Sequence, residues 1–327
     1  MINCIGFLPK GINVKKLNKF EKDEEIIKKL EHLELPIIEN DYENEESDTN
    51  ECIVESDLII YLSLNNRDLS YFQFHVYDEE MDDFVIHHDI YVFSSINDTE
   101  YLNFNNKHYV ALATFENNIM VYDALVKNPM TPQILLEGHS GPVMSITKNN
   151  TYMYSGSEDL SFITWDLEKL CSVKKTPLEY IPEKICLTEN KSVIIGSKDK
   201  VHVFNTEYEI KLEGTIHNLV ANGDNFYISD SSGALSIYDV RNPTVPKNHI
   251  KVSEQPLTGL DVLENVVAVS SLDGHINVFD TNNLQVKFSH KIKNEIHSVK
   301  LSKENVLFFG DGDDNLNIKK VEDLFVC

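Results

Sequence analysis

Three side chains of the types used in nucleophilic catalysis lie close together near the middle of the sequence. His139 is followed by a serine at position 155 or 157, and Asp159 comes shortly after. A serine activated by a histidine that a carboxylate orients is the usual arrangement of a nucleophilic site. Here Trp165, a large side chain suited to a core, belongs to the same set. We therefore interpret His139, Ser155, Asp159 and Trp165 as a buried hydrogen-bonded set that ties strands together.

Two other groups of residues have the composition of metal sites. Segment 311–322 spaces its acidic residues like an EF-hand calcium loop, but Leu316 stands where that loop needs glycine and no helices flank it. His87, His88 and Asp89 are adjacent, and neighbours on a strand point to opposite faces, so we expect no shared ion. The sequence also lacks a glycine-rich phosphate loop and a nucleophile elbow. We predict no enzyme activity, no cofactor, no metal and no small-molecule substrate.

The elements that must position these residues follow from a repeat. An alternating apolar run ends in an aromatic residue followed by Asp at five places, and two degenerate copies fill the remaining intervals. The copies are Tyr77-Asp78, Tyr122-Asp123, Trp165-Asp166, Phe204-Asn205, Tyr238-Asp239, Phe279-Asp280 and Lys319-Lys320. Their spacings are 45, 43, 39, 34, 41 and 40 residues. A period of about 40–45 residues is typical of WD-type propellers with four strands per blade, so we predict an all-β, seven-bladed WD-repeat β-propeller.

Each copy closes the second strand of a predicted pair, and a tight polar turn joins the two strands. In the third repeat the pair is 153–157 and 161–165. A short polar or acidic residue recurs six positions before the end of most pairs, and we expect it to cap the turn. These residues are Glu116, Asp159, Ser232, Asp273 and Asp313.

The chain divides into three predicted parts. Residues 1–20 form an N-terminal latch strand or a docking arm, residues 21–51 hold an amphipathic helix over 21–35 and a flexible acidic linker, and residues 52–327 form the propeller. The last blade needs an outer strand, since an exposed edge invites aggregation. Either Ile2–Leu8 or Leu324–Cys327 could supply it, and we favour the N-terminal strand.

Charge and cysteine content narrow the partners and the compartment. The net charge is -24, and residues 21–57 contain 15 acidic residues against three lysines. An acidic propeller makes a broad phosphate-binding surface unfavourable, so basic proteins or a local contact with RNA are the expected partners. The best candidates for such a contact are Lys10, Lys15, Lys16 and Lys19. The five cysteines are scattered, which favours a reducing compartment. No segment predicts a secretory signal or a membrane span.

The tripeptide Asp239-Val240-Arg241 admits two interpretations. It is similar to the Asp-x-Arg motif by which some WD-repeat proteins dock on cullin-type ubiquitin ligases. The simpler interpretation is an ion pair between Asp239 and Arg241 that caps a turn. The motif leaves open an alternative function as a substrate-receptor adaptor.

Several segments resemble the periodic tryptophan protein 1 family of nucleolar WD-repeat proteins. They include the opening Phe7-Leu8-Pro9-Lys10-Gly11, the strand Tyr71–Asp78, the strand Val85–Ile90, the pair within Ala111–Asp123, and Ser236–Asn242. The order of the segments matches that family, and the chain departs from it in having a single tryptophan.

This resemblance implies a non-enzymatic scaffold in ribosome biogenesis. Such a protein would assemble the large ribosomal subunit in the nucleolus by binding assembly factors, basic ribosomal proteins and pre-rRNA. A chromatin-associated role at ribosomal genes is a further alternative. No membrane or cofactor is implied.

Overall fold

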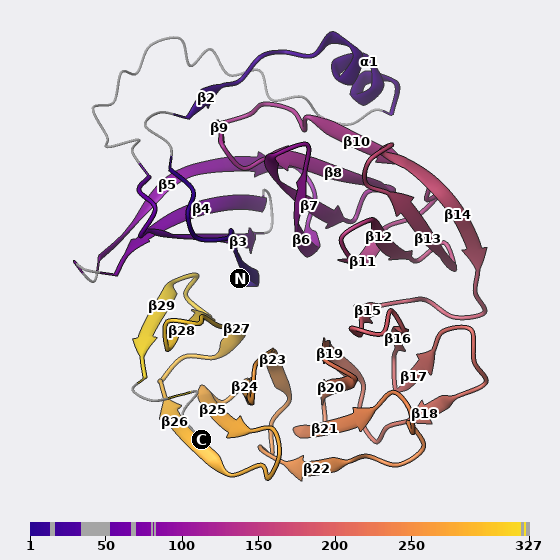
Figure 1. The fold of residues 1–327 in the computed structure, drawn as a ribbon, viewed down its shortest axis with the longest axis vertical. Helices are drawn as coiled ribbons and strands as arrows, with labels where there is room; N and C mark the ends of the chain where they lie inside the picture. Colours follow the sequence, from indigo (N-terminus) through magenta and orange to yellow (C-terminus); the bar gives the residue numbers. More distant parts are fainter. Residues whose placement is uncertain are drawn as a thin grey trace.

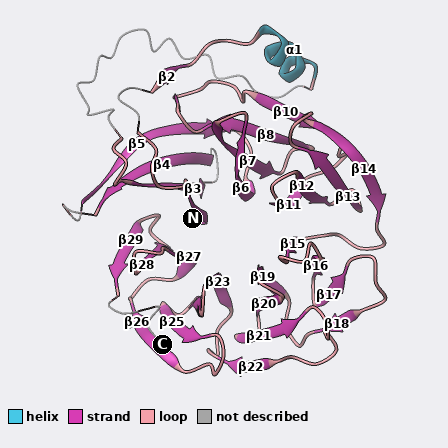
Figure 2. Cartoon of the chain, viewed as in Figure 1, coloured by secondary structure: helices cyan, strands magenta, loops and turns pink. Residues whose placement is uncertain are grey.

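The computed structural model describes residues 1–13, 17–33, 53–66, 70–79, 81, 83–321 and 324. Seven antiparallel sheets stand around a central axis, and the chain visits them in order around the ring (Figure 1). Strands dominate the described chain, with one helix outside the ring (Figure 2). The predicted seven-bladed β-propeller is confirmed.

Six blades have four strands and the last has three among the described residues. Strands are given from the inner to the outer edge of each blade. The first blade consists of β1 (Ile2–Phe7), β3 (Leu58–Asn65), β4 (Ser70–Asp78) and β5 (Asp83–Val92). The second consists of β6 (Ile96–Phe104), β7 (Lys107–Thr114), β8 (Asn118–Asp123) and β10 (Ile134–Glu137), and the third of β11 (Val143–Lys148), β12 (Tyr152–Ser157), β13 (Ser161–Asp166) and β14 (Cys171–Pro177).

The other four blades follow the same plan. The fourth blade consists of β15 (Lys184–Leu187), β16 (Val193–Ser197), β17 (Lys200–Val203) and β18 (Glu209–Lys211), and the fifth of β19 (Ile216–Asn222), β20 (Asn225–Asp230), β21 (Ala234–Asp239) and β22 (Asn248–Lys251). The sixth consists of β23 (Leu257–Leu263), β24 (Val266–Ser271), β25 (His275–Asp280) and β26 (Val286–Lys291). The seventh consists of β27 (Ile296–Leu301), β28 (Val306–Asp311) and β29 (Leu316–Lys320). Each predicted strand pair is the second and third strand of a blade.

The N-terminal strand belongs to a different blade from the one we predicted. β1 pairs antiparallel with β3, so it is the inner strand of the first blade and not the outer strand of the last. The reason is topological: the chain enters the first blade at its second strand, which leaves the inner position open. Ile2, Ile5 and Leu8 are buried there, so residues 2–8 do not form a free docking arm either.

The ring closes by packing between faces of the first and last blades. The ring centroids of Phe7 and Phe308 lie 5.3 Å apart, edge to face. Ile2 lies against Gly310, where a Cβ would come within 2.5 Å of the Cβ of Ile2, so this contact requires glycine. Of Leu324–Cys327, the other candidate, only Leu324 lies within the described residues; it is buried and its carbonyl accepts a hydrogen bond of 3.1 Å from Lys287 of β26.

The predicted helix is present but shorter, as α1 (Glu24–His32). The Asp23 carboxylate caps its first turn by accepting from two backbone N–H groups. Ile26 and Leu30 are buried in one apolar cluster with residues of the first two blades, including Leu135 of β10. Before the helix, β2 (Asn18–Lys19) pairs in parallel with β9 (Val126–Lys127), so this extension runs along the outside of the ring (Figure 1). The predicted acidic linker, residues 39–51, lies outside the described residues.

Candidate functional site: the third-blade network and the channel

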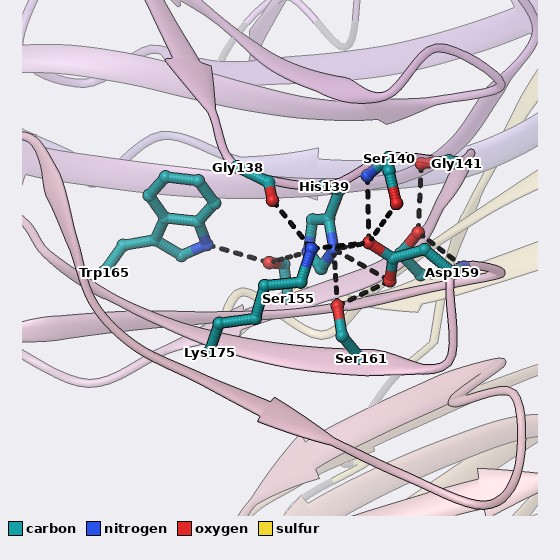
Figure 3. Close-up of polar contacts among 10 residues, drawn as sticks. Gly138, His139, Ser140, Gly141, Ser155, Asp159, Ser161, Trp165 and Lys175 are labelled. Carbon is teal, nitrogen blue, oxygen red and sulfur yellow. Dashed lines mark hydrogen bonds and ion pairs between the residues drawn. The ribbon is translucent and has the colours of Figure 1, made fainter.

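The structure brings His139, Ser155, Asp159 and Trp165 together in the third blade (Figure 3). The Trp165 indole N–H donates to the Ser155 hydroxyl oxygen at 2.8 Å. The same hydroxyl lies 2.7 Å from Nε2 of His139, and Nδ1 of His139 lies 3.2 Å from the Asp159 carboxylate. The network thus joins β12, β13 and the loop before β11.

The sequence interpretation missed two members of this network. Ser161 donates to Asp159, and Lys175 of β14 donates both to Asp159 and to the carbonyl of Gly138, each at 2.9 Å. Lys175 adds the outer strand to the set of strands held together. An acidic turn residue facing a lysine on the next strand is the signal that could have identified it.

Electrostatics assign the proton positions in this network. Burial lowers the pKa of His139, although Asp159 opposes the change, so the imidazole is neutral at pH 7. Burial alone would raise the pKa of Asp159, but hydrogen bonds from Ser161, Lys175 and the Ser140 N–H hold it below its ordinary value. The geometry therefore has Nδ1–H donating to Asp159 and Nε2 accepting from Ser155.

The arrangement gives these groups a structural role. Ser155 is fully buried, and its hydroxyl is committed to both Trp165 and His139. A nucleophile must reach its substrate, and this hydroxyl cannot.

Other blades satisfy the same turn in a different way. In the fifth and seventh blades the capping carboxylate comes two residues earlier than expected, at Asp230 and Asp311. Asp230 accepts from the N–H groups of Ser232 and Ala234, and Asp311 accepts from those of Asp313 and Asn315. In these two blades the last residue of the second strand therefore caps the turn, a role that the sequence pattern assigned to a residue of the turn itself.

The calcium-like segment is explained by the same capping. The Asp311 carboxylate is engaged by backbone N–H groups and by the side-chain amide of Asn317 at 3.0 Å. Glu322 lies outside the described residues. Among the residues that the structure describes, no three His, Cys, Asp or Glu side chains are placed to share a metal ion.

The rings of His87 and His88 in the first blade lie close together, although we expected them on opposite faces of the strand. A register shift opposite Phe74 and His75 leaves His87 as an extra residue on β5. The two Nδ1 atoms of His87 and His88 consequently lie 3.1 Å apart, although strand alternation places neighbours on opposite faces. Burial lowers the pKa of His88 to about 3 and that of His75 on β4 to about 4, so both are neutral at pH 7.

The N-terminal lysines are not gathered into one described cluster. Nζ of Lys10 lies 2.8 Å from Glu79 and 3.0 Å from Glu304, so its charge bridges the first and last blades. Lys19 is exposed on β2. Lys15 and Lys16 lie outside the described residues.

Asp239 and Arg241 form an ion pair with each other. The guanidinium Nε donates to Asp239 at 2.8 Å and Nη1 lies 3.5 Å from Asp224. The side chain of Arg241 is 69% exposed. This geometry matches the turn-capping interpretation and leaves the guanidinium accessible from solvent.

A channel of about 470 Å³ runs between the inner strands. Six inner strands carry a bulge one residue after their start, and five of the six extra residues line the channel. The extra residues are Asn3, Asn97, Met144, His217, Thr258 and His297.

Four of these bulge residues donate to a carbonyl at the start of the next inner strand. Asn3 reaches Ile96, Asn97 reaches Val143, His217 reaches Leu257, and Thr258 reaches Ile296. The donor-to-acceptor distances of the first three bonds are 3.1, 2.8 and 2.8 Å. The bulges thus link neighbouring blades in one direction around the channel.

Comparison with solved structures supports the fold. The chain is similar to the WD40 β-propeller domain of Doa1, with a TM-score of 0.67 and 14% sequence identity over 84% of this chain and 92% of that one. No known family profile matches the chain, and a search of curated proteins finds no relative. None of the helices in the described part of the chain is both long and apolar enough to cross a membrane. The chain therefore has the seven-bladed β-propeller fold of that domain.

Proposed function

We propose that this protein is a non-enzymatic scaffold in ribosome biogenesis, acting in the nucleolus on the large ribosomal subunit and on pre-rRNA processing. The observation that carries the proposal is the acidity of the chain, which has a net charge of -24, about half of it within residues 21–57. Electrostatic complementarity raises the association rate with basic proteins and suppresses acidic partners. Ribosomal proteins are the abundant basic partners that such a surface suits.

The sequence resemblance points to ribosome biogenesis as the cellular process. Segments Phe7–Gly11, Tyr71–Asp78 and Val85–Ile90 resemble those of nucleolar assembly factors. These three belong to the first blade or its N-terminal continuation, and the other two resembling segments, within Ala111–Asp123 and Ser236–Asn242, lie in the second and fifth blades. Contact with pre-rRNA would be local, since Lys10 already bridges Glu79 and Glu304 while Lys19 is exposed on β2.

Affinity purification of the tagged protein, followed by identification of RNA and proteins, tests the proposal. Large-subunit precursors and assembly factors are expected. Crosslinks to RNA should map to residues 8–20 and not to the blades. Recovery of small-subunit precursors alone, or of no ribosomal material, would refute the role.

A second function is favoured by one observation. Arg241 is exposed and held in a fixed orientation by Asp239 and Asp224, as a docking arginine should be. We infer an adaptor role in a cullin-type ligase as the alternative. Recovery of the ligase's adaptor subunit with the purified protein, and its loss in Arg241→Ala, would support this function.

A further inference from the structure

The central channel contains a carboxylate and an ammonium group that do not pair with each other. Asp98 of β6 and Lys184 of β15 both line the channel. They belong to the second and fourth blades, which the third blade separates, so the two charges come from different walls of the channel (Figure 1). Neither residue takes part in an ion pair among the residues that the structure describes.

The Asp98 carboxylate is held in place by neutral donors alone. Its Oδ1 accepts a hydrogen bond of 2.9 Å from the Thr99 N–H, and its Oδ2 accepts bonds of 2.7 and 3.0 Å from the Ser145 hydroxyl and the Ile146 N–H. These bonds fix the orientation of the carboxylate but bring no positive charge to it. Since each carboxylate oxygen can accept two hydrogen bonds, Oδ1 keeps a free position for a further donor.

Two asparagines add acceptors to the same side of the channel. Asn3 of β1 and Asn97 of β6 donate their side-chain N–H groups to the carbonyls of Ile96 and Val143. A carbonyl oxygen can only accept, so these bonds fix which end of each amide carries the nitrogen and leave each Oδ1 as an acceptor. This wall therefore suits a positively charged group with several N–H donors.

Lys184 has the opposite requirement. It is half-buried, and it has no hydrogen-bond or ion-pair partner among the described residues. The other cationic groups that line the channel are engaged: Nζ of Lys300 lies 2.8 Å from Asp261, and the ammonium of Met1 pairs with Asp314. Partial burial of an unpaired ammonium costs free energy, which a bound carboxylate would offset.

The two unpaired charges act in the same part of the channel. Burial is the main cause that raises the pKa of the Cys4 thiol to about 11, while Asp98 raises it further and Lys184 opposes the change. Charges act strongly only over short distances in salt solution, so Asp98 and Lys184 share the space around Cys4. The thiol remains neutral at pH 7, so it does not serve as a counter-ion for Lys184.

We propose that the channel binds a small zwitterion, an amino acid, whose ammonium group contacts Asp98 and whose carboxylate pairs with Lys184. The Oδ1 atoms of Asn3 and Asn97 accept further N–H groups of the ligand. A simple anion would meet the charge of Asp98, and a simple cation would meet that of Lys184, so each is disfavoured. The volume of about 470 Å³ lies within the range of about 300–1,000 Å³ found for small-molecule sites. The site is separate from the proposed scaffold function.

The probes are glycine, 4-aminobutanoate and 6-aminohexanoate, which hold the two charged groups at increasing separation, and the full chain is the receptor. Isothermal titration calorimetry at pH 7 should show saturable binding of at least one of them. The amine and the carboxylate of the same chain length should each bind at least about tenfold more weakly, because each leaves one channel charge without a partner. Absence of binding by all three at about 10 mM would overturn the proposal.

The matched variants are Lys184→Glu and Lys211→Glu. Each reverses one charge on the fourth blade, and Lys211 is exposed on the outer strand β18. Lys184→Glu should weaken binding of the amino acid at least about tenfold and should create binding of 1,4-diaminobutane, since both walls then carry a carboxylate. Lys211→Glu should leave both ligands unchanged. Equal binding of the amino acid by the two variants would overturn the proposal.

Three further outcomes are decisive. If Lys184→Glu does not melt like the unmodified protein, Lys184→Met replaces it, and this variant should lose the amino acid without gaining the diamine. Binding of the amine as tight as that of the amino acid would show a cation site and overturn the proposal. Equally tight binding of the carboxylate would show an anion site and would also overturn it.

Discussion

The third and first blades share a four-stranded plan but are held together by different chemistry. In the third blade four strands consecutive in the chain are tied by a polar network centred on Ser155. In the first blade the inner strand comes from the N-terminus, and rings fill the interior: Phe72 and Phe74 are fully buried, and Phe74 stacks on His88 with centroids 4.4 Å apart.

The difference shows that one fold tolerates two ways of treating buried polar groups. The third-blade network satisfies each polar side chain with a partner inside the blade. Neither ring nitrogen of His75 in the first blade has a hydrogen-bond partner among the described residues. An unpaired buried polar group costs free energy, so the first blade depends on apolar packing and on the neutral form of its histidines.

The largest expected effect comes from removing the strand that completes the first blade. Deleting residues 1–9 removes the buried side chains of Ile2, Ile5 and Leu8, each worth about 2–5 kcal/mol by analogy with large-to-alanine changes. We expect loss of cooperative thermal unfolding, measured by calorimetry. As a control, Met1→Ala changes a half-exposed side chain and should melt normally. A deletion variant that melts like the full chain would show that β1 does not hold the ring closed.

The next effect tests the third blade. Trp165→Ala should destabilise the protein by about 3–5 kcal/mol, because it empties a large buried volume. Trp165→Phe keeps much of the packing but leaves the Ser155 hydroxyl without its donor, so a smaller loss of about 1–3 kcal/mol is expected. Chemical denaturation of both variants measures the difference. Equal losses would show that the hydrogen bond contributes nothing beyond packing.

Acid should destabilise the first blade through its two buried histidines, His75 and His88. The pKa of His75 falls from 6.5 to about 4, and that of His88 falls from 6.5 to about 3, with burial as the main cause and the neighbouring His87 and Lys127 adding to the shift of His88. Between pH 6.5 and pH 4 the unfolded chain binds protons that the folded chain does not. The free energy of unfolding should therefore decrease as the pH is lowered through this range, with a slope of up to about 1.4 kcal/mol per pH unit for each histidine.

The control for this acid effect is His75→Phe, which should flatten the slope while keeping an aromatic ring beside Phe84. Hydrogen exchange at pH 5 should locate the loss of protection in β4 and β5. An unchanged slope in the variant would mean that the acid sensitivity lies elsewhere.

The smallest effect is expected at the surface ion pair. Arg241→Ala should leave stability nearly unchanged, because the pair is solvent-exposed. Denaturation at low and high salt measures the effect, and Lys247→Ala serves as a nearby surface control. A clear loss of stability would mean that Arg241 holds the fold and would weaken its interpretation as a docking residue.

The sequence predicted the strand pair at the centre of each blade but missed most of the inner strands. The aromatic-Asp endings placed the second and third strands of every blade, because those strands are largely buried runs that end at a recurring signal. Most inner strands escaped detection because a bulge interrupts their alternation at residues such as Asn97 and His217. The Ile2–Phe7 strand was recognised, but local pattern cannot tell which of two neighbouring blades a terminal strand joins.

Among the candidate site residues, the outcome depended on whether a recurring pattern marks the position. His139, Ser155, Asp159 and Trp165 were identifiable because they match the pattern of one repeat. Ser161 and Lys175 were missed because no such pattern marks them. The meeting of His87 and His88 was missed because it arises from a register shift set by β4.

The hydrogen bonds that link neighbouring inner strands around the channel are missing beside the fourth blade. The third blade presents Met144 at the bulge position, and thioether side chains donate no hydrogen bond. The fourth blade pairs β15 with β16 without any shift, so it has no bulge residue to offer. The fourth blade is therefore the one described blade that lacks this bond at both of its junctions. The junction between the seventh and first blades lacks it as well, and across the junction between the third and fourth blades the N–H of Ile185 donates instead to Oγ of Ser145 at 3.1 Å. A ring opens where adjacent segments are least tied, so thermal breathing, first proteolytic cuts and tolerated chain breaks should all concentrate beside β15.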